Sequence, residues 1–204
     1  MLADWSVECS AEDPVLVIPW SDPSQPENTP HFIDLRENPY DLDQIPEAEL
    51  YPPLMQALRA LNAPRSPVFT AKCDAWELDS AELEELRYEL DLTDSAHESA
   101  DTAAGFASYI DLIWRDRSVF ASFHHSEQLL HRLARLAAPI AQPYAMLECT
   151  LRPALVDLTT AQEGYSVTVY VKALGPDLFT AKEVWSAALE EIVALLRSKD
   201  IALA

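Results

Sequence analysis

The sequence predicts an α+β fold in which an antiparallel sheet is layered with helices. Segments of alternating apolar and polar residues recur along the chain, as is typical of strands with one buried face, and residues 165–172 form the cleanest of them. Segments with apolar residues at helical spacing separate these strands. The three glycines, Gly105, Gly164 and Gly175, are isolated, so the sequence has no Gly-rich phosphate loop, no dinucleotide-binding fingerprint and no nucleophile elbow.

The first third of the chain is rich in proline. Eleven of the 15 prolines lie between Pro14 and Pro67, which predicts extended or turned connections. Residues 15–20 form a short apolar run that suits a buried strand, and Pro19 confines that strand to a sheet edge or a strand end. A second strand is predicted over residues 31–36.

Helix and strand alternate in the next segment. Residues 51–62 predict a helix, because prolines fit its first turn and leucines recur on one face. The strand predicted over residues 68–76 turns Cys73 toward the core. A second helix is predicted to start at Asp79, whose spacing to Glu82 fits a capping box.

The order predicted after residue 105 is strand, strand, helix, strand, strand, helix. Residues 106–115 and 119–124 predict two strands joined by a tight turn, and Ser126 then caps a helix that Pro139 stops. The last elements are a strand from Ala145 with Cys149 inward, the strand 165–172, and a long helix whose capping box is Thr180 with Glu183.

We predict one compact domain over residues 1–204. It would consist of a proline-rich half, 14–91, and a ββαββα half, 105–204, joined by an acidic linker, 92–104. Residues 58–73 and 133–149 both run Leu-x-x-Leu-x-Ala-Pro, then Pro, then Cys. Two interpretations stay open: a duplication of a ββαβ unit, with the second copy extended by a strand and the C-terminal helix, or a chance match of common residues.

The charge and the cysteines limit the partners and the compartment. A formal net charge of -20 argues against nucleic acid and against an anionic membrane surface, and it favours a basic protein partner or plain solubility. The three cysteines have no CxxC spacing, no secretory signal is evident, and no apolar run is long enough to span a bilayer. The sequence therefore predicts a cytoplasmic protein that needs no cofactor.

The strongest run of negative charge lies on the second predicted helix and beyond it. Its solvent face carries the candidate partner-binding residues Glu82, Glu84, Glu85 and Glu89. A solvated helix face with no partner is the alternative. Arg115, Arg117, Arg132, Arg135 and Arg152 form a basic group that either pairs with this helix, within the chain or across a homodimer, or binds a carboxylate or phosphate.

Histidines are concentrated in one segment. His124, His125 and His131, with Arg132 and Arg135, are candidate ligand-binding residues for an anion. Glu127 and His131 share a helix face, which allows a metal site, although the spacing is not HExxH; surface histidines are the alternative. No catalytic residue stands out, because Cys73 and Cys149 are predicted to point inward.

The order of the C-terminal elements and the acidic charge resemble those of small bacterial secretion chaperones and of immunity proteins that neutralise toxins. This resemblance is one of topology, covers about half of the chain, and involves no shared motif. It implies a non-enzymatic, cytosolic protein-binding module, either adaptor, chaperone-like or immunity-like, with an acidic surface. The alternative is a small-molecule anion-binding protein or enzyme with an Arg and His pocket between the two halves.

Overall fold

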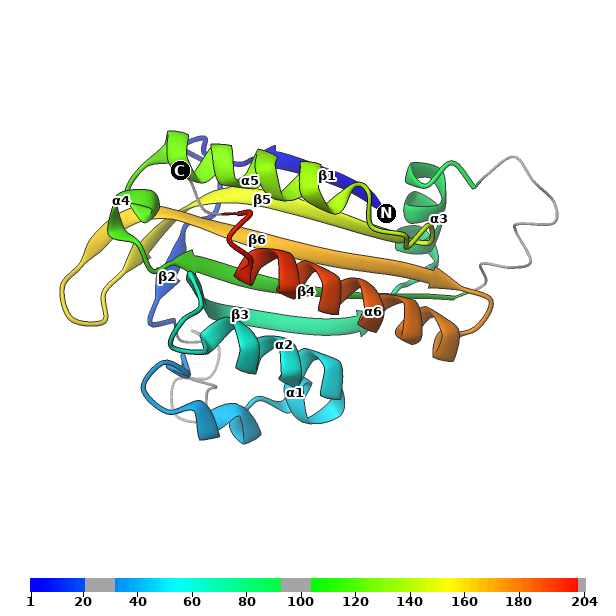
Figure 1. The fold of residues 1–204 in the computed structure, drawn as a ribbon, viewed down its shortest axis with the longest axis horizontal. Coiled ribbons are helices and arrows are strands. Elements are labelled where there is room, and N and C mark those ends of the chain that lie inside the picture. Colours follow the sequence, from blue (N-terminus) through cyan, green and yellow to red (C-terminus); the bar gives the residue numbers. More distant parts are fainter. Residues whose placement is uncertain (21–31, 93–103, 202–204) are drawn as a thin grey trace.

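The computed structural model describes residues 1–20, 32–92 and 104–201, which form a mixed six-stranded sheet packed with helices (Figure 1). Four strands make an antiparallel array in the order β5-β6-β4-β3, and β1 and β2 both pair with β5 in parallel. The strands are β1 (Leu2–Val7), β2 (Leu16–Ile18), β3 (Val68–Glu77), β4 (Ala104–Trp114), β5 (Ala145–Val156) and β6 (Gln162–Gly175).

Three helices cover one face of the sheet. These are α2 (Pro52–Asn62), α5 (Phe123–Ala137) and α6 (Leu178–Arg197), which lie in front of the strands in Figure 1. We call this the covered face and the opposite one the open face. The remaining helices are the 3₁₀ helix η1 (Pro39–Gln44), α1 (Pro46–Leu50), α3 (Ser80–Glu89) and the short α4 (Arg117–Phe120).

The main hydrophobic core lies between the sheet and these three helices. Phe106 of β4 is fully buried there, with its ring 4.8 Å from that of Trp185 of α6 and 5.0 Å from that of Tyr51. The indole N–H of Trp185 donates to Ser108 Oγ at 2.9 Å, so the one polar side chain of β4 in this region has a partner. α3 lies on the open face at one end, where Leu86 packs on Met146 and Leu174 in a second, small cluster.

The predicted α+β class is confirmed, and most of its elements lie where the sequence places them. α2, β3, β4, β5 and β6 match the predicted segments to within a few residues. The capping box of α3 is also confirmed: Asp79 accepts from the backbone N–H of Glu82, and Glu82 accepts from that of Asp79.

The segment predicted as a strand over residues 119–124 is helical instead. Asp116 caps α4 by accepting from Ser118 N, and Ser122 caps α5 by accepting from His125 N. Two side-chain caps six residues apart favour two helix starts over a hairpin. Ser126, predicted as the cap, is a buried residue inside α5 whose hydroxyl donates to Val119 O.

The edges of the sheet also differ from the prediction. The sheet is mixed and not purely antiparallel, because β1, which we did not predict, and β2 run parallel to β5. No strand forms over residues 32–36, and residue 31 lies outside the described residues. The carboxylate of Asp34 accepts from the backbone N–H and from the guanidinium of Arg36, which stabilises a turn there. The last helix is capped by Asp177 and not by Thr180.

The strands of the two matching stretches, residues 58–73 and 133–149, belong to one continuous sheet. α2, β3 and β4 follow one another in the same order as α5, β5 and β6, and the two antiparallel pairs meet where β4 pairs with β6. They also differ, because β3 carries a bulge between Thr70 and Cys73 and α3 interrupts its link to β4, whereas β5 and β6 join in a short hairpin. The duplication itself therefore stays a prediction.

Two further predictions concern the acidic linker and the absence of a membrane-spanning segment. The acidic linker 92–104 falls almost wholly within residues 93–103, outside the described residues. Among the helices of the described ranges, none combines the length and the apolar character needed to cross a bilayer.

Candidate functional site

The open face of the sheet is the most distinctive surface of the described residues. Cross-strand register places the even-numbered side chains of β6, from Ser166 to Lys172, on this face, and their partners on β4 and β5 lie beside them. Large helices do not cover this central region, because α2, α5 and α6 all pack on the other side (Figure 1). Its side chains are nevertheless largely polar or aromatic, and several are buried by their neighbours.

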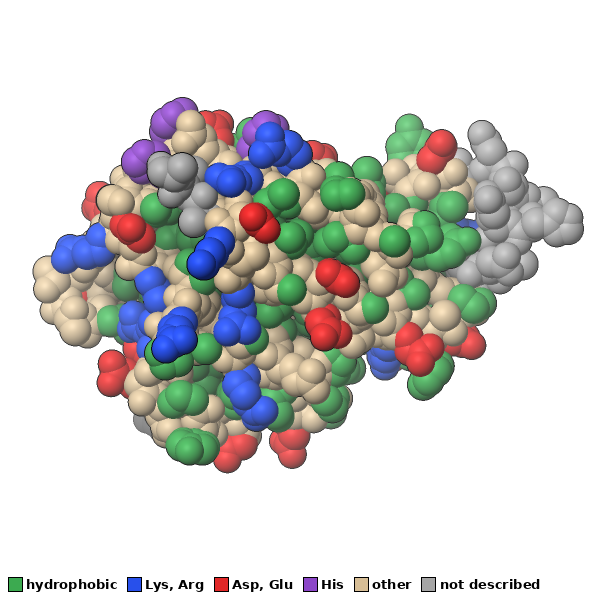
Figure 2. All heavy atoms as spheres, in the orientation of Figure 1, with side chains coloured by type: hydrophobic (Ala, Val, Ile, Leu, Met, Phe, Trp, Pro, Cys, Tyr) green, Lys and Arg blue, Asp and Glu red, His purple; other side chains and the backbone are tan. Residues whose placement is uncertain are grey.

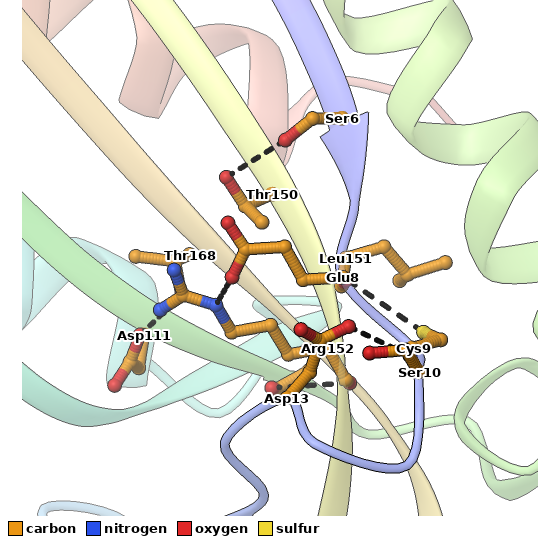
Figure 3. Close-up of polar contacts among 11 residues, drawn as sticks. Ser6, Glu8, Cys9, Ser10, Asp13, Asp111, Thr150, Leu151, Arg152 and Thr168 are labelled. Atoms are coloured by element: carbon orange, nitrogen blue, oxygen red, sulfur yellow. Dashed lines mark hydrogen bonds and ion pairs between the residues drawn. The ribbon is translucent and has the colours of Figure 1, made fainter.

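A row of four short polar side chains crosses the centre of the open face (Figure 3). Ser6 of β1, Thr150 of β5, Thr168 of β6 and Asp111 of β4 are consecutive cross-strand partners. The hydroxyl of Thr168 donates to Asp111 Oδ1 at 2.6 Å, and that of Ser6 donates to Thr150 Oγ1 at 3.2 Å. These bonds satisfy buried polar groups and fix the row in position.

Asp111 is a buried carboxylate at the end of this row. Asp111 is 7% exposed, and burial raises the pKa of its carboxyl group because the charged form is poorly solvated there. The Thr168 hydrogen bond and the positive charges of Lys72 and Arg152 oppose this rise. Burial therefore disfavours the charged form of Asp111, while the two neighbouring cations favour it.

An ion pair with Glu8 anchors Arg152 beside Asp111. Arg152 Nε donates to Glu8 Oε2 at 2.7 Å, and Figure 3 shows the guanidinium extending over the sheet toward Asp111 and Thr168. Glu8 follows β1 directly, and its backbone N–H donates to Leu151 O, which continues the β1 pairing. The parallel edge strand thus supplies the acid that orients a cation on the open face.

Aromatic side chains form the next row of the open face. Tyr109 and Tyr170 are cross-strand partners with ring centroids 5.9 Å apart, and Trp76 lies 6.3 Å from Tyr109. All three are half-buried. Burial, followed by the negative charge of Asp111, raises the pKa of Tyr109, so its hydroxyl stays protonated at neutral pH.

Acidic residues from three elements meet at the α3 end of this face. Lys172 Nζ donates to Glu148 Oε2 at 2.9 Å, and Glu89 of α3 lies close enough to interact electrostatically with both side chains. Burial raises the pKa of Glu89, Lys172 opposes the rise, and the carboxylates of Glu148, Glu85 and Asp4 reinforce it. Of the predicted partner-binding glutamates, Glu85 and Glu89 therefore belong to this face. Glu82 caps α3 and accepts from the Trp76 indole N–H at 3.1 Å, and Glu84 is an exposed residue of α3.

The predicted ligand-binding residues of α5 lie elsewhere, on the covered side of the molecule. His124 contacts Gln128 within the helix, His125 lies beside Ser118 O, and the ring of His131 packs edge-on against Trp5 at 5.9 Å. Arg135 is exposed, and Arg132 is half-buried. None of these five residues lines any of four hollows found among the described residues.

The described residues hold no group of potential metal ligands, and neither Cys73 nor Cys149 is placed as a reactive thiol. Nowhere in ranges 1–20, 32–92 and 104–201 do three His, Cys, Asp or Glu side chains converge as metal ligands. Cys149 is completely buried on the covered face. Cys73 lines a hollow of about 160 Å³ at the β3 edge, and burial raises the pKa of its thiol to about 12, which leaves it protonated.

The open face was not predicted from the sequence. The signal was present, since Asp111 interrupts an otherwise apolar strand and Thr150, Thr168 and Arg152 occupy outward positions of alternating segments. What was missing was the strand order, which decides that these residues form one row.

Comparison with known proteins adds no further evidence about the site. The chain matches no family model, no curated protein and no solved structure.

Proposed function

We propose that the chain is a non-enzymatic, cytosolic protein-binding module that docks a basic protein partner on the open face of its sheet. The observation that carries this proposal is the run of half-buried Trp76, Tyr109 and Tyr170 across a sheet surface that α2, α5 and α6 leave uncovered. Trp, Tyr and Arg are the residue types that most often dominate binding energy at protein interfaces.

Charge supports a basic partner. Carboxylates outnumber cations on and around this face: Asp4, Glu8, Asp74, Asp111, Glu148, Glu85 and Glu89 against Lys72, Arg152 and Lys172. The net charge of -20 adds a long-range field that would steer a basic protein toward the molecule. The three free cysteines support a reducing compartment such as the cytosol.

The rigidity of the face supports a binding surface that is already formed in the free protein. Ser6, Thr150 and Thr168 are held by side-chain hydrogen bonds, and Arg152 is held by Glu8, so the surface is organised before a partner arrives. Preorganised side chains lose little conformational entropy on binding.

The test is capture of partners from a lysate of the source cells at several salt concentrations, with matched tyrosine variants. Tyr170→Ala should abolish capture of a specific protein, and Tyr40→Ala, which alters an 87% exposed tyrosine on η1, should retain it. With the captured protein in purified form, Tyr170→Ala is expected to raise the dissociation constant about thirtyfold, because a central aromatic anchor is lost. Equal capture by both variants, or no specific capture even at low salt, would refute the proposal.

A further inference from the structure

A hollow of about 510 Å³ lies at the end of the sheet opposite α3, and it includes Ile113, the cross-strand partner of Ser166, but none of the aromatic residues Trp76, Tyr109 and Tyr170. It forms where β3 begins and β4 ends, beside α4 and the hairpin between β5 and β6. Three arginines line it, Arg36, Arg115 and Arg117, and Glu37 is the one carboxylate among its described lining residues.

The three arginines are held to different degrees. Arg36 pairs with Asp34 through two hydrogen bonds of 2.8 Å and 2.6 Å. Arg115 instead donates to two backbone carbonyls, Val68 O and Asn62 O, so its charge has no carboxylate partner in the described contacts. Burial lowers the pKa of Arg115, the charge of Arg36 adds to this effect, and the carboxylate of Asp34 opposes it.

Arg117 is the most available of the three. It is exposed at the start of α4, and none of the described hydrogen bonds or ion pairs involves its guanidinium. An arginine in this state keeps all five N–H donors for a ligand.

A buried donor without an acceptor provides a second, independent observation. Trp114 lines the hollow and is 7% exposed, yet its enclosed indole N–H has no hydrogen-bond partner in the structure. Native proteins rarely leave a buried donor unpaired, so such a group requires an explanation. A ligand oxygen is one acceptor that would satisfy it.

The rest of the lining combines apolar side chains with threonine hydroxyls. Phe69 lies beneath Arg36, with the guanidinium 4.2 Å from the ring centroid, and Phe120 and Leu158 lie nearby, while Thr159 and Thr160 come from the hairpin. Apolar walls with a few convergent polar groups are typical of small-molecule sites.

The surroundings of the hollow reinforce its positive charge. Exposed basic residues at the ends of α2 and α6 and in the turn after α2 occupy the same end of the molecule: Arg59, Arg65, Arg197 and Lys199. Figure 2 shows blue side chains gathered there, whereas red ones dominate toward the opposite end of the same face. In a chain of net charge -20, this is the end that attracts an anion.

We propose that this hollow binds a small molecule that carries an oxyanion group, carboxylate or phosphate, on an apolar body. Arg115, Arg117 and the Trp114 indole N–H bind the oxyanion, and Phe69 and Phe120 contact the apolar part. The site is separate from the proposed protein-binding surface and does not depend on it.

Calorimetric titration of the purified protein tests this proposal with two probes, phenyl phosphate and benzoate. At least one should bind saturably, and comparison of the two distinguishes a phosphate from a carboxylate ligand. Arg117→Gln should weaken that binding about tenfold or more, because a charge-assisted bond is lost, while Arg135→Gln, which alters an exposed arginine of α5, should leave it unchanged. Absence of saturable binding by either probe, or equal effects of both variants, would overturn the proposal.

Trp114→Phe provides a second measurement that a purely structural role would not explain. This variant removes the unpaired indole N–H but puts a smaller side chain in the core, so the protein should stay folded with a modest loss of unfolding temperature and yet bind the probe more weakly. Unchanged binding by a folded Trp114→Phe protein would remove the indole from the site and contradict the proposal. Neither outcome affects capture of a protein partner by the wild-type chain, so the two proposals fail separately.

Discussion

On the covered face of β6, Val167, Val169 and Val171 are at most 2% exposed, whereas the open face of the same strand carries Ser166, Thr168, Tyr170 and Lys172. The two faces share one backbone and one set of hydrogen-bonded strands. They differ in the contacts that their side chains make. Helices bury the apolar side chains of the covered face, whereas hydroxyls, carboxylates and cations form hydrogen bonds and ion pairs across the open face.

Under the proposed function, the covered face determines the stability of the fold and the open face determines partner binding. Apolar packing on the covered face contributes most of the folding free energy, because burial of large side chains is worth far more than exposed polar contacts. The open face contributes less to folding, and its polar side chains pair with one another through hydrogen bonds and ion pairs. Substitutions on the two faces should therefore differ in which measurement they change.

The largest effect is expected from Phe106→Ala on the covered face. Removal of this fully buried ring, which packs on Trp185 and Tyr51, should lower the free energy of unfolding by about 3–5 kcal/mol. Urea denaturation measures it. Tyr170→Ala on the open face is the matched control, and an equal loss in that variant would break the distinction between the faces.

A smaller effect is expected from Asp111→Ala. The substitution leaves the buried Thr168 hydroxyl without its acceptor, which should cost about 1–3 kcal/mol in the free energy of unfolding. Asp111→Asn keeps an acceptor oxygen and should cost less. Equal losses in the two variants would mean that the hydrogen bond is not the cause.

The same pair of proteins gives a pH dependence. The pKa of Asp111 is raised in the folded state, so between the ordinary aspartate pKa and the raised value the folded chain binds more protons than the unfolded chain, and stability falls as pH rises through that window. Asp111→Asn cannot ionise and should lack this decline. The wild-type protein should therefore lose stability relative to Asp111→Asn as pH rises above the ordinary aspartate pKa, and parallel pH profiles would contradict the raised pKa.

The covered face was largely predictable from the sequence, and the open face was not. The alternation in residues 165–172 separates the inward valines from the outward polar residues without any knowledge of neighbours, because strand period is a local property. The row from Ser6 to Asp111 depends instead on β1 pairing with β5 and β4 with β6, which are contacts between segments more than fifty residues apart. The α5 histidines clustered in sequence, but the helix leaves them on its exposed side.

The smallest effect is expected from Glu8→Gln at the edge of the open face. Glu8 and Arg152 are 41% and 23% exposed at their side chains, so solvent screens the pair and its loss should change the free energy of unfolding by about 0–1 kcal/mol, less at high salt. Because Glu8 orients the cation beside Asp111, the same variant should weaken capture of a protein partner more than it weakens folding. Glu12→Gln, on the exposed turn that follows, is the control for charge alone. A loss of stability well above this range would place Glu8 among the groups that hold the fold, and equal capture by the Glu8 and Glu12 variants would remove the ion pair from the binding surface.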